Sequence, residues 1–427
     1  MKLLIKNGRV VSPADSLDET LDVLVEDGRI VEVRSKVEAA ADRVVDASRL
    51  VVAPGFIDMH VHLREPGFEE KETIRTGSRA AARGGFTSIA CMPNTFPVND
   101  NAGVTEFILS EAKRVGLVNI LPIAAVTRGL EGEQLTDMAD LAAAGAVAFS
   151  DDGQPVGSAQ IMRRAMDYGR LLRALIIDHC EEKSLTEDGV MNEGRASYLF
   201  GLRGMPAMAE EIMVSRDIIL AEHLGARVHI AHLSVKGALP LLRAAKERGV
   251  AVTAEVTPHH LVLTDAACEG YDTHFKVNPP LRSAEDVAAL TEAVREGLID
   301  VFATDHAPHT AEDKELEFDR APFGINGLET AVSLLLDRLV AAGVIPLNRL
   351  VEMMSVNPAA LLGLERKGRV RPGADADLTL LNLAKETVVD AARFESKSRN
   401  TPFHGWKLKG LSVQTIVAGR VVYPFDE

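Results

Sequence analysis

Short apolar runs alternate with longer stretches rich in Ala, Glu and Arg between about residue 54 and residue 365. The apolar runs have the length of buried strands, and the stretches between them have the character of helices. Repeated units of this kind are typical of a parallel sheet with helices packed around it. Eight strands are predicted, at 55–63, 86–93, 118–126, 146–151, 174–179, 227–233, 251–257 and 299–304.

Eight strand–helix units over roughly 300 residues fit a (β/α)8 barrel of the TIM type, whose active site lies at the carboxyl ends of the strands. A doubly wound open sheet is the alternative, but no Gly-x-Gly-x-x-Gly motif follows any predicted strand. The sequence therefore predicts an α/β fold built on a barrel.

Both ends of the chain have a different pattern, of short strands joined by tight turns. Asn7-Gly8 and Asp27-Gly28 each stand between β-rich runs, which predicts two hairpins. Residues 377–383 form an alternating strand pattern, and residues 413–423 predict a further hairpin.

These two β-rich ends predict one small β-sandwich domain formed by both termini, because domain termini tend to lie close together. We place this composite domain at residues 1–53 plus 366–427, and the barrel at residues 54–365.

Polar side chains gather where the predicted strands end. His60 and His62 are two residues apart on the first strand, so both side chains point to one face and could hold one metal ion. With the ends of the later strands, the candidate ligands are His60, His62, an aspartate at 151 or 152, His179, His232 and Asp305. Four histidines and two carboxylates suit two ions about 3.5–4 Å apart, which lower the pKa of bound water toward about 7.

A histidine taken alone is more often a hydrogen-bonded structural residue than a ligand, so the metal site is predicted from the whole set. The residues interpreted as structural or supporting are Asp58, His229, His259, His260 and His306. Cys91 and Cys180 are interpreted as packing residues, because two-metal hydrolysis needs no thiol.

Together these motifs resemble the amidohydrolase superfamily and, within it, the dihydroorotases of the long bacterial class. The resemblance covers essentially the whole chain and is carried by His60-x-His62-Leu-Arg64, Met92-Pro-Asn94, Phe149-Ser-Asp-Asp-Gly153, Asp178-His-Cys-Glu181, Asn278-Pro-Pro-Leu-Arg282 and Thr304-Asp-His-Ala-Pro-His309. It implies a zinc-dependent, reversible cyclisation of N-carbamoyl-L-aspartate to L-dihydroorotate plus water, a step of pyrimidine synthesis.

The resemblance also implies a division of the ligands between two zinc ions. His60, His62 and Asp305 would hold one ion, and His179 and His232 the other. Asp305 would in addition carry the proton between water and the ring nitrogen.

The bridge between the two ions is the point at which this chain departs from many relatives, which use a carbamylated lysine. No lysine stands at the end of the fourth strand, which favours a carboxylate bridge. The resemblance implies that this bridge is the aspartate just before Gly153, Asp152, with Asp151 as its rival.

For the substrate, the resemblance implies that Arg64 makes a bidentate pair with the α-carboxylate, helped by Asn94 and His309. Asn278 and the backbone near Phe323-Gly324 would read the amide edge of the ring. The expected substrate contacts are His62, Arg64, Asn94, Asn278, His309, Phe323 and Gly324. The charged segment 310–322 is either a solvated loop or a loop that closes over the substrate.

Composition narrows the classes of partner. A net charge of -15 argues against nucleic acid or an anionic membrane, so an anionic substrate must be recognised by a few local cations. The N-terminus is not a signal peptide, no apolar run is long enough for a membrane helix, and three distant cysteines predict no disulfide framework. A cytoplasmic enzyme is expected, and the resemblance adds a homodimer and an association with aspartate transcarbamoylase as expected partners.

Two alternatives compete with this interpretation. Hydantoinases, dihydropyrimidinases and allantoinases typically carry the lysine bridge, and the first two lack an arginine after His-x-His, so Arg64 and Asp152 argue against them. A non-catalytic barrel that supports a partner enzyme would have lost metal ligands, whereas all six candidates are present here.

Overall fold

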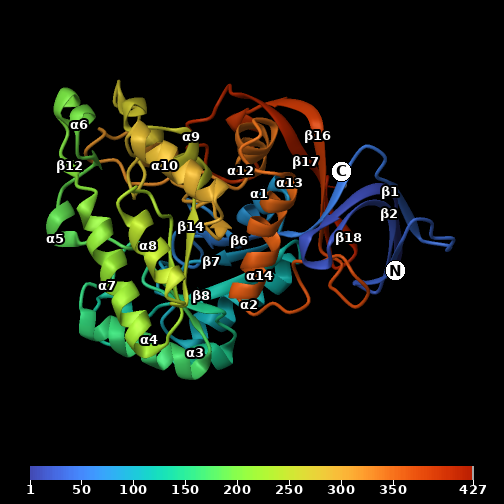
Figure 1. Ribbon diagram of the computed structural model, residues 1–427, viewed down its shortest axis with the longest axis horizontal. Helices are drawn as coiled ribbons and strands as arrows, with labels where there is room; N and C mark the ends of the chain where they lie inside the picture. Colours follow the sequence, from blue (N-terminus) through green and yellow to red (C-terminus); the bar gives the residue numbers. More distant parts are fainter. Residues whose placement is uncertain (426–427) are drawn as a thin grey trace.

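The computed structural model describes residues 1–425, as a barrel flanked by a smaller β-unit (Figure 1). Eight parallel strands form the barrel sheet in the order β15-β14-β13-β10-β9-β8-β7-β6. Their bounds are Phe56–Val61 (β6), Phe86–Cys91 (β7), Asn119–Ala124 (β8), Ala148–Ser150 (β9), Leu175–Asp178 (β10), Val228–Ile230 (β13), Val252–Val256 (β14) and Val301–Phe302 (β15). All eight predicted strands and the barrel fold are confirmed.

The barrel closes where the chain after β15 meets the end of β6. The backbone N–H of His62 donates to the carbonyl oxygen of His306 at 2.8 Å, and Val61 and His306 form a parallel bridge. Phe56, Phe86 and other large side chains of the strands are fully buried in one hydrophobic core with the surrounding helices. Strands covered on both faces need apolar residues on both, which explains the continuous apolar runs in the sequence.

Helices surround the barrel on its outside (Figure 1). They are α1 (Ile74–Gly84), α2 (Ala102–Val115), α3 (Met138–Ala144), α4 (Ala159–Leu172), α5 (Lys183–Thr186), α6 (Arg195–Phe200), α7 (Met208–Leu224), α8 (Ala238–Glu247), α9 (Pro258–Val262), α10 (Ala284–Arg295), α11 (Ala311–Lys314), α12 (Ala331–Leu335), α13 (Leu347–Val351) and α14 (Asn357–Leu361). A two-stranded sheet pairs β11 (Met191–Asn192) with β12 (Gly204–Met205). No helix within residues 1–425 is long and apolar enough to cross a membrane.

The local sequence fixes where several of these helices begin and end. Thr73 begins α1 with a reciprocal hydrogen-bonded cap, and Gly85 ends it in the left-handed conformation, at φ 98°. Ser283 begins α10 with the same kind of cap.

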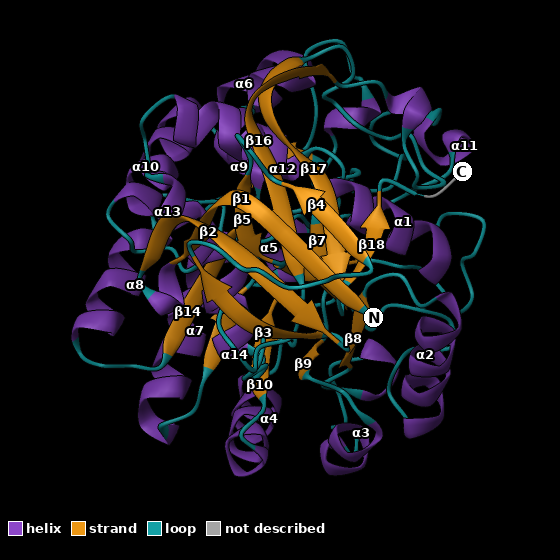
Figure 2. Cartoon of the chain, turned by 90° about the vertical axis from the view of Figure 1, so that its right-hand side faces the viewer, coloured by secondary structure: helices purple, strands orange, loops and turns teal. Residues whose placement is uncertain are grey.

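The β-unit joins both ends of the chain in one sheet, ordered β18-β17-β16-β5-β1-β2-β3 with β4 paired to β1 (Figure 2). Its strands are β1 (Lys2–Ser12), β2 (Leu17–Glu26), β3 (Arg29–Arg34), β4 (Arg43–Asp46), β5 (Val51–Pro54), β16 (Leu378–Val388), β17 (Lys407–Val417) and β18 (Arg420–Tyr423). β5 and β16 pair antiparallel, and Leu3, Val52, Leu378 and Ile416 share a second core. A small β-domain made from both termini is thus confirmed, while its boundaries at 53/54 and 365/366 stay a prediction.

One of the predicted hairpins is wrong. Asp27-Gly28 does turn the chain between β2 and β3, with φ 48° and 79°, but β1 runs straight through Asn7-Gly8. Here the positive φ of Asn7, 61°, makes an irregularity in the pairing of β1 with β2, and its N–H donates to Asp22 Oδ1 at 2.9 Å. The same backbone freedom that favours a turn therefore forms a bulge.

The connection between β16 and β17, residues 389–406, leaves the β-unit and packs against the barrel. Phe394 and Phe403 are buried in a cluster that contains Val277 and Ile325 of the barrel. This connection brings C-terminal residues close to the loops that follow the barrel strands.

Candidate active site

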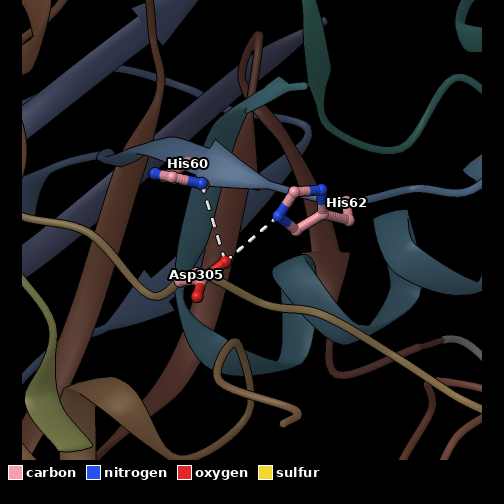
Figure 3. Close-up of side chains that lie close together, drawn as sticks. All are labelled: His60, His62 and Asp305. Carbon is pink, nitrogen blue, oxygen red and sulfur yellow. Dashed lines mark hydrogen bonds and ion pairs between the residues drawn. The ribbon is translucent and has the colours of Figure 1, made fainter. Parts of the chain in front are cut away.

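The first group of candidate ligands lies at the carboxyl ends of β6 and β15. His62 Nε2 is 3.1 Å and His60 Nε2 is 3.6 Å from the same oxygen, Asp305 Oδ1 (Figure 3). All three side chains are nearly or fully buried. The strand-end placement that the sequence predicted has brought three residues from opposite ends of the barrel sequence together.

Asp152 lies between this group and the remaining histidines. Its Oδ1 is 3.2 Å from His60 Nε2, 3.5 Å from His232 Nε2 and 3.7 Å from His179 Nδ1. Its Oδ2 is 3.4 Å from His62 Nε2. A carboxylate that faces all four histidines has the position that a bridge between two ions requires.

Asp151 points elsewhere. Its carboxylate accepts hydrogen bonds from the backbone N–H groups of Val126 and Thr127, at 2.8 and 3.0 Å, and from the Thr127 hydroxyl. The geometry therefore favours Asp152 over Asp151 as the ligand.

The donor atoms fit a metal cofactor. His60 Nε2 and Asp152 Oδ1 are buried without a hydrogen-bond partner, although buried polar atoms are normally paired. His179 Nδ1 and His232 Nε2 converge to 2.9 Å. Two ligand clusters result, His60 with His62 and Asp305, and His60 with Asp152 and His232. Imidazole and carboxylate donors of this kind suit zinc and similar ions.

Three of the ligand histidines are oriented by a partner on the ring nitrogen that faces away from the centre. His60 Nδ1 lies 2.7 Å from Glu255 Oε1, and His62 Nδ1 lies 2.9 Å from Asn94 Oδ1. His179 Nε2 lies 2.9 Å from Glu181 Oε2. Because these oxygens can only accept, each outward nitrogen carries the proton and the inward nitrogen is left free for a metal.

Glu255 was not predicted from the sequence. It is fully buried on β14, where it also accepts from the His232 backbone N–H at 3.1 Å and lies 3.2 Å from His229 Nε2. Burial opposes its charge, but the neighbouring His60 and the hydrogen bond from His229 hold the pKa of Glu255 far below its usual range, so Glu255 is a carboxylate that can accept from His60 Nδ1. A glutamate within an apolar strand was the only signal for it in the sequence.

Replacing Glu255 with glutamine is expected to weaken metal binding by about 10–100-fold, as the loss of such orienting partners does in other metal sites. Metal retained by the protein during titration with a chelator measures this effect. Glu210→Gln is the matched control, because Glu210 is also buried but contacts Ser234 and Arg282. Equal metal loss in both variants would contradict the orienting role of Glu255.

A cavity of about 290 Å³ opens beside the ligand cluster. It is lined by all seven predicted substrate contacts, and also by Gly153, Ala307 and Pro322, which were not among those predicted contacts. Its small volume suits a small ligand.

Arg64 supplies the positive charge of this cavity. Its Nε donates to the Pro308 carbonyl oxygen at 3.2 Å, which fixes the guanidinium at the cavity wall. Burial lowers the pKa of Arg64 to about 10, so the side chain is still a cation at neutral pH. His309 beside it is neutral, because burial and the charge of Arg64 lower the pKa of His309 to about 2.

Asn278 and His309 make hydrogen bonds to other residues of the site. The Asn278 amide nitrogen donates to Glu181 Oε2 at 3.0 Å, so it connects the cavity to the partner of His179. His309 Nε2 donates to the Phe323 carbonyl oxygen at 2.8 Å.

The charged segment 310–322 contains α11 and is fixed at its base. Lys314 is buried and its Nζ donates to the carbonyl oxygens of Thr273 and Pro322, at 3.1 and 2.8 Å. Closure of this segment over a substrate stays a prediction.

Three of the predicted site residues have a left-handed backbone. The φ angles are 65° at Arg64, 31° at His232 and 49° at Asp305. Such a conformation costs a non-glycine residue of the order of 1–3 kcal/mol and is typical of functional sites.

Comparison with known proteins agrees with this geometry over the whole chain. The dihydroorotase of Pelotomaculum thermopropionicum is 58% identical over 422 residues, which cover 99% of this chain and 98% of that protein. The dihydroorotase of Syntrophus aciditrophicus is 53% identical over 428 residues and covers both chains completely. The chain belongs to the dihydroorotase family.

Sequence models of two families match the chain in sequence order. The one described as Dihydro-orotase-like matches residues 48–238, and the one described as Amidohydrolase family matches residues 220–423. These matches agree with the amidohydrolase superfamily and the dihydroorotases that the motifs predicted. A metal cofactor is consistent with both the family and the ligand clusters.

Solved structures extend the likeness to the other cyclic-amide hydrolases. L-hydantoinase from Arthrobacter aurescens has a TM-score of 0.87 and 30% sequence identity, over 98% of this chain and 95% of its own. D-hydantoinase from Thermus sp. has a TM-score of 0.82 and 28% identity, over 98% and 94%. This dihydroorotase-family chain thus shares its barrel and β-unit with hydantoinases.

Proposed function

We propose that this protein catalyses the reversible cyclisation of N-carbamoyl-L-aspartate to L-dihydroorotate plus water, in the synthesis of pyrimidines. Full-length relatives at more than half identity are dihydroorotases. The observation that carries the proposal is the placement of a buried guanidinium, Arg64, in the same small cavity as the metal-ligand cluster. A cyclic amide that bears a carboxylate needs both.

We propose zinc as the metal, with two ions per chain. His60, His62 and Asp305 would hold one ion, His179 and His232 the other, and Asp152 both, in keeping with the distances between these side chains. When bound, the ions would polarise the carbonyl oxygen of the substrate and lower the pKa of bound water toward about 7.

The chain's own groups bind the substrate and move the proton. Arg64 would pair with the carboxylate in a bidentate manner, and Asn94 and His309 would complete its surroundings. In the hydrolytic direction Asp305 would take a proton from the attacking water and give it to the ring nitrogen as the carbon–nitrogen bond breaks. Cyclisation follows the same steps in reverse.

The remaining partners are proposals from the resemblance. We propose a cytoplasmic homodimer that works alone or in association with aspartate transcarbamoylase. Its substrate is a small anion, recognised locally by Arg64 in spite of a net charge of -15.

A comparison of two substrates tests the function and separates it from that of a dihydropyrimidinase. The protein should hydrolyse L-dihydroorotate and cyclise N-carbamoyl-L-aspartate, but act poorly on dihydrouracil, which has the same ring without the carboxylate. Arg64→Met should lower kcat/KM for dihydroorotate by about 10–100-fold, because hydrogen bonds to charged groups contribute about 1.5–3 kcal/mol. It should leave the slow hydrolysis of dihydrouracil unchanged.

Arg64→Lys is the control for geometry, because it keeps the charge but not the bidentate fork. Preference of the unaltered protein for dihydrouracil or a hydantoin would overturn the proposal.

A further inference from the structure

A buried segment of the β16–β17 connection, residues 396–401, lies behind the wall of the substrate cavity, and we call it the strap. Ser396, Ser398, Asn400 and Thr401 are between 1% and 5% exposed. The strap belongs to neither a helix nor a strand, so its polar groups need partners outside regular structure. Ser396 donates to Glu72, whereas Ser398 and Asn400 find partners on the loops that follow β15.

Asn400 joins two of these loops. Its amide nitrogen donates to the carbonyl oxygen of Ala307 at 3.2 Å and to that of Gly324 at 3.0 Å. Both acceptors line the cavity, whereas Asn400 does not. A side-chain amide has two N–H donors, so both are used to connect the two parts of the wall.

Ser398 fixes the backbone of His309, which lies between Ala307 and Gly324 in the sequence. Its hydroxyl donates to the carbonyl oxygen of His309 at 2.5 Å and accepts from the backbone N–H of the same residue at 3.2 Å. The ring of His309, in turn, donates to the Phe323 carbonyl oxygen. The strap therefore fixes the backbone of His309, and His309 fixes the opposite loop.

The loops that contain Ala307 and Gly324 pack directly against each other. Gly324 has φ 129°, and a Cβ added there would lie 2.6 Å from Ala307 Cβ and 2.8 Å from Ala307 O. A shift of one loop must therefore move the other, since packed groups transmit displacement.

We propose that Asn400 is a positioning residue, which holds the cavity wall formed by Ala307, His309, Phe323 and Gly324 in the geometry that binds substrate. The identity of that substrate rests on the proposed function, but the contacts that define the wall do not. Through Asn400 the C-terminal β-unit takes part in substrate binding, although it contributes none of the candidate metal ligands.

Replacing Asn400 with alanine leaves two buried carbonyl oxygens without a donor, and the wall must rearrange to satisfy them. Asn400 makes no hydrogen bond to a candidate metal ligand through its side chain, so these ligands should stay in place. We expect KM for dihydroorotate to rise by about 10–100-fold, as small misplacements of binding groups do, while kcat and metal content stay close to those of the unaltered protein.

Asn119→Ala is the matched control. The Asn119 amide nitrogen also ties the barrel to the β-unit, by donating to Thr87 O at 2.8 Å and Asp377 Oδ2 at 2.9 Å, but at the opposite end of the barrel. Both variants should lose stability. A rise in KM confined to Asn400→Ala supports the proposal, and an unchanged KM, or an equal rise in both variants, overturns it.

Hydrogen–deuterium exchange separates this inference from the proposed function. Peptides that contain residues 306–309 and 323–326 should exchange faster in Asn400→Ala than in Asn119→Ala. This comparison holds even if the unaltered protein proves inactive on dihydroorotate, which would overturn the proposed function alone. Unchanged exchange in Asn400→Ala would overturn the positioning role.

Discussion

Asp305→Asn is expected to lower kcat for dihydroorotate hydrolysis by about 10³-fold, because general acid–base catalysis contributes about 10²–10⁴-fold. The amide keeps an oxygen at the place where Asp305 faces His60 and His62, but it cannot accept the proton. Burial opposes ionisation of Asp305, but the histidines around it hold the pKa of its carboxyl at about 2, so at neutral pH the side chain is a carboxylate that can accept a proton. Steady-state rates in both directions measure the effect.

The control is the same substitution in the same βα-unit. Asp300 precedes β15 at the opposite end of the barrel, where it pairs with Lys246 at 2.7 Å and accepts from the Ala254 N–H. Asp300→Asn should lower the thermal midpoint and leave kcat close to normal. If Asp305→Asn kept most of its activity, the proton would have to be carried by another group.

Asp152→Asn is the second change with a large expected effect. It removes the charge that faces all four histidines, so each of the two proposed ions would lose its charged bridging ligand. Metal content should fall, and kcat should fall by more than the roughly 10–100-fold that the loss of an orienting partner costs. Metal analysis and rate measurement on the same preparation give both quantities.

Asp151→Asn is its neighbour and its control. The amide keeps an oxygen to accept from the N–H groups of Val126 and Thr127, so the loop should hold its shape. Metal content and kcat should stay near normal, with some loss of stability. The reverse result, metal lost in Asp151→Asn and kept in Asp152→Asn, would make Asp151 the bridge.

The sequence could predict the barrel and the clustering of the candidate ligands because parallel strands bring their carboxyl ends to one face. Only the resemblance favoured Asp152 over Asp151, because β9 ends at Ser150 and the alternation of strand side chains no longer applies beyond it. The hairpin predicted at Asn7 was wrong because a residue with positive φ is found in a β-bulge as well as in a turn.

The supporting residues depend on contacts between distant parts of the chain. Glu255 meets His60 across the barrel, and Asn400 reaches Ala307 from a connection in the β-unit. Neither residue stands in a local pattern that differs from those of ordinary buried polar residues. Their roles follow from tertiary packing, which periodicity does not describe.

The order of the chain gives the strap a consequence for biosynthesis. Every candidate metal ligand precedes residue 306, whereas Asn400 lies in the connection between β16 and β17. β5 can pair with β1 early, but its other edge stays open until β16 has been made. Because domains generally fold from the N-terminus during translation, the metal ligands can assemble while the substrate cavity is still open on one side. A nascent chain could thus gather its candidate metal ligands before the wall of its substrate cavity is held in place.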